Sequence, residues 1–125
     1  MKNYIREALN TLPGNWYKGA YYDVLNNKNM CGIGHVAHAI AQDTGKTRLD
    51  GTKLDVGNAF FFEENGFDFV DVMAKVAREQ FPERFPDVKK DGFANFNDHE
   101  DTTEDEVIMV MEKAAVMVDE YHEDS

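Results

Sequence analysis

Cysteine is nearly absent from this chain, since Cys31 is the only one among 125 residues. No disulfide can form within the chain, which excludes a disulfide-stapled secreted scaffold and fits a reducing compartment. Long apolar runs are missing too: the longest aromatic run is Phe60–Phe62, whereas a membrane span needs about 18 apolar residues. The N-terminus lacks the apolar stretch of a signal peptide. We therefore expect a cytoplasmic protein without a membrane partner.

Basic residues are scarce in the last part of the chain. From Asn95 to Ser125, Lys113 is the only Lys or Arg, so this segment carries −10 of the total charge of −11. Such a one-sided field repels nucleic acid and anionic membranes and attracts basic partners. The eleven acids are Asp98, Glu100, Asp101, Glu104, Asp105, Glu106, Glu112, Asp119, Glu120, Glu123 and Asp124.

The hydrophobic residues predict a mainly α fold. They make up 42% of the chain, which is enough for one ordinary domain spanning residues 1–125. Apolar residues at helical spacing predict four to five helices. The clearest helices cover residues 5–12, 33–45, 69–80 and 104–121, and a shorter one is expected over 58–64.

The segments between these helices predict one short β-hairpin, so that α+β is the alternative label for the fold. Tyr and Val residues over 16–25 indicate a strand, the Asn-rich residues 26–29 a turn, and residues 30–32 a returning strand. Residues 43–57 are expected to form an exposed loop, 81–86 a stiff connector and 93–99 an aromatic loop.

Two features of the last helix concern its start and its polar side. Thr103 and Glu106 have the spacing of a capping box, so acids in the first turn have a structural interpretation beside a binding one. Met109 and Val116 lie seven residues apart on the polar side, where an apolar pair is a candidate partner contact or an ordinary surface feature. Three acids at the end of this helix are further candidates for binding: Glu120, Glu123 and Asp124.

Candidate chemistry is concentrated in the second helix. On a helical wheel, Cys31, His35 and His38 share a face opposite the apolar stripe. They could form a nucleophile and its base, with Asp23 or Asp98 as the orienting carboxylate, or three ligands to zinc. The third interpretation is two solvated histidines and a small buried cysteine.

Neither the nucleophile interpretation nor the zinc interpretation is supported by a complete sequence motif. No second Cys pair and no hydrolase signature surrounds Cys31, and the acid-rich stretch 95–106 lacks the glycine that a calcium loop needs at its sixth position. The Lys and Arg residues are scattered, which disfavours nucleic-acid binding. We expect no metal and no cofactor.

Two segments resemble a family of small uncharacterised bacterial and phage proteins. The first is a G-x-W-x-x-G…D…C-x-x-G pattern from Gly14 to Gly34, and the second is Phe96-Asn97-Asp98 followed by Thr103 and Glu106-Val107, with Phe96 where the pattern prefers Trp. The resemblance implies a helical domain with a small hairpin and a link to phages, and it implies no activity. It marks six positions for inspection: Trp16, Asp23, Cys31, Gly34, Asn97 and Asp98.

These observations lead to two main hypotheses of function. The favoured one is a non-enzymatic interaction protein, a phage accessory protein whose acidic end binds a protein with a basic surface. A variant is a nucleic-acid mimic whose carboxylates imitate phosphates. The second is a cysteine hydrolase that uses Cys31 with His35 or His38. The sequence leaves homo-oligomerisation open.

Overall fold

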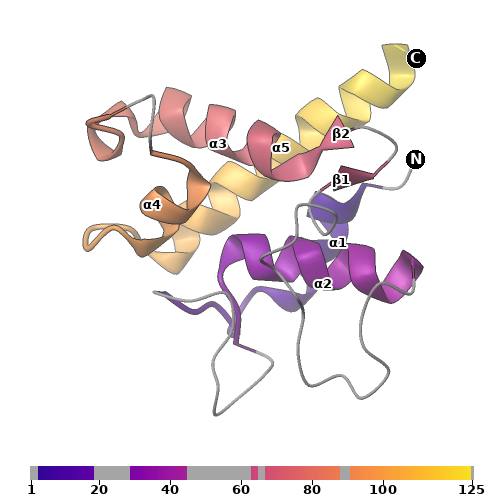
Figure 1. The fold of residues 1–125 in the computed structure, drawn as a ribbon, viewed down its shortest axis with the longest axis horizontal. Coiled ribbons are helices and arrows are strands. Elements are labelled where there is room, and N and C mark those ends of the chain that lie inside the picture. The colour runs from indigo at the N-terminus through magenta and orange to yellow at the C-terminus, as the bar shows by residue number, and fades with distance from the viewer. Residues whose placement is uncertain (1–2, 19–28, 45–62, 65–66, 88–90, 125) are drawn as a thin grey trace.

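A computed structural model describes residues 3–18, 29–44, 63–64, 67–87 and 91–124 (Figure 1). Within these ranges the chain is mainly helical, as predicted. Its elements in chain order are α1 (Tyr4–Thr11), α2 (Gly32–Thr44), β1 (Glu63–Glu64), β2 (Phe67–Asp68), α3 (Phe69–Gln80), the 3₁₀ turn η2 (Pro82–Arg84), α4 (Phe93–Asp98) and α5 (Glu104–Asp124).

The long helix α5 packs against both α1 and α3, and α1 in turn packs against α2 (Figure 1). The short helix α4 contacts α3 and α2, so it closes one end of this arrangement. One side of α5 is therefore bound to the body of the molecule. The opposite side is left for solvent.

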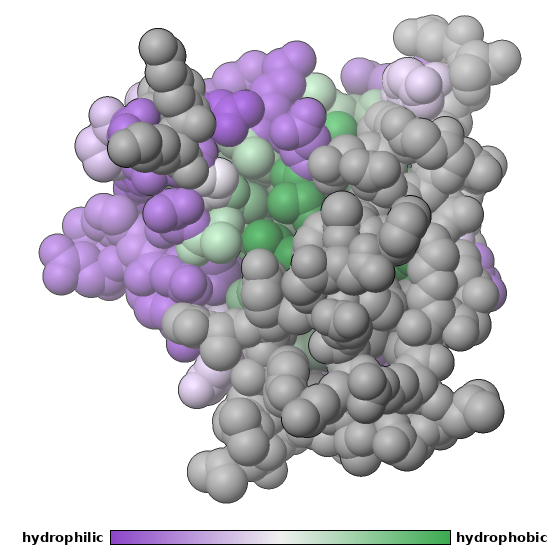
Figure 2. Space-filling view, in the orientation of Figure 1, coloured by the Kyte–Doolittle hydropathy of each residue, from purple (hydrophilic) through white to green (hydrophobic). Residues whose placement is uncertain are grey.

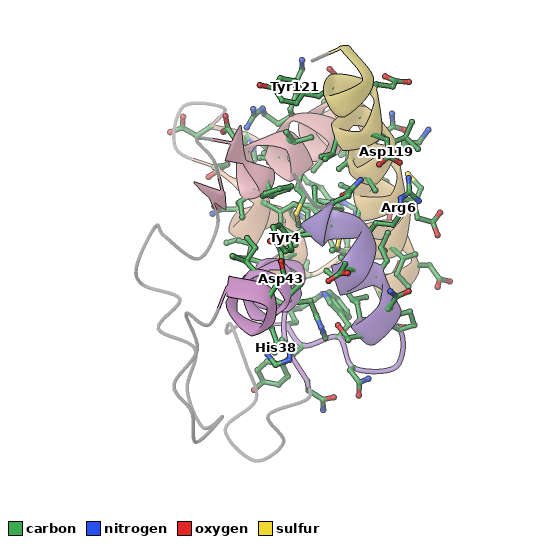
Figure 3. All side chains as sticks on the ribbon, turned by 90° about the vertical axis from the view of Figure 1, so that its right-hand side faces the viewer. Tyr4, Arg6, His38, Asp43, Asp119 and Tyr121 are labelled. Carbon is green, nitrogen blue, oxygen red and sulfur yellow. The ribbon has the colours of Figure 1, made fainter. Side chains whose placement is uncertain are left out.

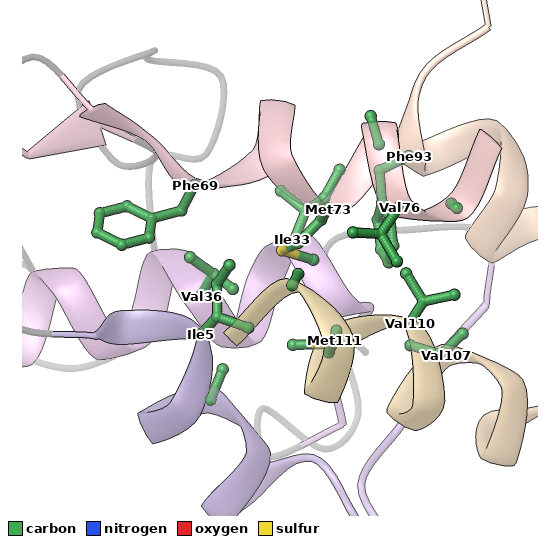
Figure 4. Close-up of a cluster of buried hydrophobic side chains, with 14 of the residues drawn as sticks. Ile5, Ile33, Val36, Phe69, Met73, Val76, Phe93, Val107, Val110 and Met111 are labelled. Atoms are coloured by element: carbon green, nitrogen blue, oxygen red, sulfur yellow. The ribbon is translucent and has the colours of Figure 1, made fainter. Parts of the chain in front are cut away.

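The core lies where the inner faces of these helices meet (Figure 4). The apolar stripes predicted from 3.6-residue spacing are buried as expected, because each stripe turns toward the neighbouring helices. Fully buried side chains come from α1, α2, α3, α4 and α5 and include Ile5, Val36, Phe69, Met73, Phe96, Val107, Val110 and Met111. Hydrophilic residues cover much of the described surface on the face drawn in Figure 2, with hydrophobic residues visible near its centre.

Side chains satisfy free amides at the starts of two helices. The side chain of Asn3 accepts a hydrogen bond from Arg6 N at the start of α1. At the start of α5, Glu106 N donates to Thr103 Oγ1 at 3.3 Å, and Thr103 N donates to Glu106 Oε1 at 2.9 Å. The capping box predicted from the sequence is thereby confirmed.

The described residues do not show the predicted hairpin over residues 16–32. Trp16 and Met30 form one isolated bridge, and it is parallel rather than antiparallel. The expected returning strand fails because Gly32 already begins α2. Residues 19–28, which include Asp23 and most of the predicted turn, lie outside the described part of the chain.

A short antiparallel pair occurs elsewhere, with Glu63 opposite Asp68 and Glu64 opposite Phe67. The helix expected over 58–64 is therefore wrong at residues 63–64, and its remainder lies outside the described ranges. The expected loop over 43–57 is wrong at Asp43 and Thr44, which complete α2. The rest of that loop is likewise not described.

The predicted aromatic loop over 93–99 is instead the helix α4. Its aromatic residues Phe93 and Phe96 are three positions apart, so they share a helix face, and both are buried. The ring of Phe96 stacks on Phe81 and Phe85, at centroid distances of 5.3 and 6.2 Å. Asn95 Oδ1 accepts a hydrogen bond from Gly92 N at 3.1 Å and completes the helix start. Six residues are too few to show a full helical period, so the sequence alone does not distinguish this short helix from a loop.

Candidate functional site

The side-chain amide of Asn97 is the centre of a buried polar network. Its Oδ1 accepts hydrogen bonds from Trp16 Nε1 at 2.7 Å and from Gly32 N at 3.1 Å. Its Nδ2 donates to Tyr17 O at 3.2 Å and to Asp98 Oδ1 at 3.0 Å. All four hydrogen-bonding positions of this fully buried amide are thus occupied. Asn97 thus joins residues 16–18, which we call the bridge segment after the Trp16–Met30 bridge, to the start of α2 and the end of α4.

Lys18, next to Tyr17 in the chain, links the bridge segment to the turn that follows α4. Its Nζ donates to His99 O at 2.7 Å and to Thr102 O at 2.9 Å, in the turn between α4 and α5. The same ammonium group lies 5.5 Å from the centroid of the Trp16 ring. The charge of Lys18 is therefore engaged by carbonyl groups and an aromatic face. Sequence reasoning missed this residue, because a lone Lys in a Tyr-rich stretch carries no distinctive signal.

Cys31 acts as a helix-starting residue rather than as an exposed nucleophile. Its Sγ accepts a hydrogen bond from Gly34 N at 3.4 Å, and its carbonyl accepts one from His35 N at 3.0 Å. The side chain is buried, and this burial raises the pKa of the Cys31 thiol to about 11, with a further contribution from the Asp98 carboxylate. The thiol is consequently neutral near pH 7, where a nucleophile would need the thiolate.

His35 is also buried and holds α1 to α2. Its Nε2 lies 3.0 Å from Asn15 O, and its Nδ1 lies 2.9 Å from Thr11 Oγ1. Because a carbonyl oxygen can only accept, Nε2 carries the proton. The lone pair of Nδ1 then faces the Thr11 hydroxyl, which also lies 3.2 Å from Ala8 O. Burial lowers the pKa of His35, so the imidazole is neutral near pH 7. Both ring nitrogens are therefore used in structural hydrogen bonds.

The interpretation of two solvated histidines beside a small buried cysteine holds for Cys31, which is buried, and is wrong for His35, which is buried as well. Only His38 among them is half-exposed, and it projects from the outer side of α2 (Figure 3). The wheel placed the histidines opposite the apolar stripe, but α2 is enclosed on most sides, so the second face is buried too. Within the described ranges, no group of three or more His, Cys, Asp or Glu residues could hold a metal ion.

Several acids of the C-terminal segment are engaged in the fold. Glu106 Oε1 accepts from Arg84 Nη1 at 2.9 Å, and this ion pair lowers the pKa of Glu106. Asp119 pairs with Arg6 and accepts from Asn3 Nδ2 at 2.8 Å, which ties α5 to α1 (Figure 3). Part of the acidic charge is therefore structural.

Three exposed acids of α5 lie on its solvent side together with two apolar residues, and we call this side the outer face. On a helical wheel, the five residues of the outer face fall within a sector of about 80° on the side opposite the buried stripe of α5. They are Asp105, Met109, Glu112, Val116 and Glu120. Val116 is 49% exposed, whereas Met109 is half-buried and packs against the core. Among the described residues, no ion pair engages the three carboxylates of this face.

The other candidate binding residues have different positions. Tyr121 is 54% exposed near the end of α5 (Figure 3). Glu123 and Asp124 belong to α5, but their side chains lie outside the described part of the structure. Gly34 is buried in the first turn of α2, and Trp16 is half-buried.

A comparison with known protein families shows where the chain belongs. The model of a family of unknown function, DUF6197, matches residues 2–117. No curated protein and no solved structure matches the chain. Among the described helices, none combines the length and the apolar character needed to cross a membrane.

Proposed function

Since the chain belongs to DUF6197, a family of unknown function, its role has to be argued from its own surface, and we propose that it is a non-enzymatic binding protein. In this proposal the outer face of α5 receives a protein with a basic surface. The observation that carries the proposal is that the three outer-face carboxylates form no ion pair among the described residues and share their face with the exposed Val116.

Electrostatics supports such a role. Asp105, Glu112 and Glu120 are exposed, and Lys113 is the only Lys or Arg in the C-terminal segment. Exposed charges of one sign accelerate the encounter with a partner of opposite sign and disfavour partners of like sign. The exposed Val116 adds apolar area that a charged surface alone lacks. A basic protein can therefore gain both attraction and burial at this face.

The state of the candidate catalytic residues favours binding over catalysis. A neutral, buried Cys31 thiol is poorly suited to nucleophilic attack. Both ring nitrogens of His35 are already in hydrogen bonds, with Thr11 and Asn15. The cysteine hydrolase remains the less favoured alternative. The nucleic-acid mimic also ranks lower, because the free carboxylates follow a single helix. A cytoplasmic site and an accessory role in phage-infected cells are parts of the proposal that rest on the sequence alone.

The association rate of a lysine-rich polypeptide with the full chain tests this proposal. A Glu112→Gln/Glu120→Gln variant removes two charges from the outer face. A Glu79→Gln/Glu100→Gln variant removes two exposed charges elsewhere and serves as the matched control. We expect the first variant to associate several-fold more slowly than the control at low salt, and the difference to shrink above about 0.3 M salt. Equal rates for the two variants would contradict the proposal.

A further inference from the structure

The outer face of α5 carries two apolar residues that lie one heptad apart along the helix axis. Met109 and Val116 are seven residues apart, and Glu112 lies between them. Asp105 and Glu120 stand at the two ends of the row. The row covers the sixteen residues 105–120, which span about 22 Å at a rise of about 1.5 Å per residue. Residues seven apart lie on the same side of a helix, so a second helix laid along α5 can contact both apolar side chains.

From this pattern we infer that the partner places a basic amphipathic helix along α5, an inference that rests on the proposed function. Apolar side chains of the partner helix would cover Met109 and Val116. Lys or Arg residues on either side would meet Asp105, Glu112 and Glu120. A partner helix of about 15 residues matches the length of the row.

The backbone of α5 favours a helix over an extended peptide at this face. An extended peptide binds mainly by adding its main chain to an exposed sheet edge. The amides and carbonyls within α5 are instead used by the helix itself. A partner helix likewise satisfies its own backbone, so it can lie on α5 through side chains alone.

The charge of the face argues against a second copy of this chain as the occupant. Two copies placed face to face would bring three carboxylates of one copy toward the same three of the other. Lys113, at the edge of the face, is the only Lys or Arg of α5 that could offset them. Like charges at close range disfavour such an interface, whereas a cationic helix gains at each position.

Two synthetic peptides of identical composition test the inference with the full chain. Peptide A is a Lys-rich helix with leucines on one face at heptad spacing. Peptide B contains the same residues with the leucines distributed around the helix. We expect peptide A to bind about tenfold more tightly than peptide B, because only A can bury its leucines against Met109 and Val116.

Two substitutions locate the apolar contact. Val116→Ser should weaken binding of peptide A by about fivefold, since it removes exposed apolar area without changing the charge. Tyr121→Ser alters the other large exposed hydrophobic residue of α5 and should leave the affinity unchanged. Thermal melting of both variants shows whether they are folded, which is expected because both side chains are exposed.

The outcomes separate this inference from the proposed function. Equal affinity for the two peptides, with no effect of Val116→Ser, would overturn the helix-docking inference while leaving electrostatic binding in place. Loss of the expected difference between Glu112→Gln/Glu120→Gln and its control would overturn the proposed function itself. Dimerisation of the chain that is abolished by Val116→Ser in sedimentation experiments would show that a second copy occupies the face, against the inference.

Discussion

At the scale of single residues, the polar groups that looked like candidates for chemistry hold the fold together. Asn97, Cys31 and His35 each satisfy backbone groups that would otherwise be buried without a partner. An unpaired buried amide or carbonyl costs free energy, so these side chains contribute to stability through the groups they satisfy. Three substitution or reactivity experiments test this interpretation.

Replacing Asn97 should destabilise the protein strongly. Asn97→Ala leaves Trp16 Nε1, Gly32 N and Tyr17 O without this hydrogen-bonding partner. We expect the free energy of unfolding to fall by about 3 kcal/mol in urea denaturation. Asn10→Ala, at an exposed position of α1, is the control and should change stability little. A loss below about 1 kcal/mol for Asn97→Ala would contradict the network's structural role.

The buried imidazole of His35 predicts lower stability in mild acid. Burial lowers the pKa of His35 from its ordinary value of 6.5, so the unfolded chain binds a proton more readily than the folded one. The resulting stabilisation is present above pH 6.5 and is lost as the pH falls toward the folded-state pKa. The free energy of unfolding should therefore decrease from pH 7 to about pH 5.5.

A pair of histidine variants distinguishes this contribution from others. Burial also lowers the pKa of the half-exposed His38, so both sites add to the slope in the same direction. His35→Gln and His38→Gln should each flatten the dependence in denaturant titrations at several pH values. If His35→Gln left the pH dependence of the free energy of unfolding the same as in the unsubstituted protein, the role given to His35 would be contradicted.

The thiol of Cys31 should react slowly in the folded protein. With its pKa raised from 9.0 to about 11, the thiolate fraction near pH 7 is about a hundredfold lower than for an ordinary cysteine. Burial slows access further. A chromogenic disulfide reagent should label the unfolded chain in urea quickly and the folded chain slowly. Rapid labelling of the folded protein at pH 7 would instead support the hydrolase hypothesis.

At the scale of elements, regular apolar spacing predicted the long helices, and less regular segments were harder to predict. The boundaries of α5 at its start follow from Thr103 and Glu106, whose capping box is visible in the sequence. The helix α4 was missed because it has only six residues and lacks a full apolar period. At the described ends of the predicted hairpin, Trp16 and Met30 form a parallel bridge, so Tyr-rich composition did not predict the pairing of these two residues. Packing between distant residues decides it.

The site was predictable only in part for the same reason. The sequence could single out Trp16 and Asn97, but the hydrogen bond between them spans 81 positions and depends on the fold. His35 was placed on a solvent face because a wheel describes one helix in isolation. Contacts from α1, through Thr11, bury that second face. Lys18 and Arg84 carried no signal before the turns they bind were known.

The close packing of α2 against α4 predicts an effect of adding one methyl group. A Cβ built at Gly32 would lie 2.7 Å from Phe93 Cε1, inside the normal contact distance. Gly32→Ala should therefore lower the free energy of unfolding by about 1–3 kcal/mol, as measured in urea. Gly92→Ala is the matched control, because a Cβ there meets no atom within 4 Å. Equal stability of the two variants would mean that the helices separate at little cost.

At the scale of the whole molecule, charge is divided between the fold and the surface. Glu106 and Asp119 bind Arg84 and Arg6, so they stabilise packing between elements. Asp105, Glu112 and Glu120 have no such ion pair among the described residues and face solvent. This division supports the view that contacts with the other helices hold α5 in place and that the outer face of α5 is available for binding.

The most direct test of that view is a map of backbone amide signals by NMR during titration with the heptad-patterned basic peptide. The account predicts that the largest shifts occur on α5 at Met109, Glu112, Val116 and their neighbours, with small changes around Trp16 and Asn97. Shifts centred on α2 or on the Trp16 corner, or a spectrum unchanged at saturating peptide, would contradict it.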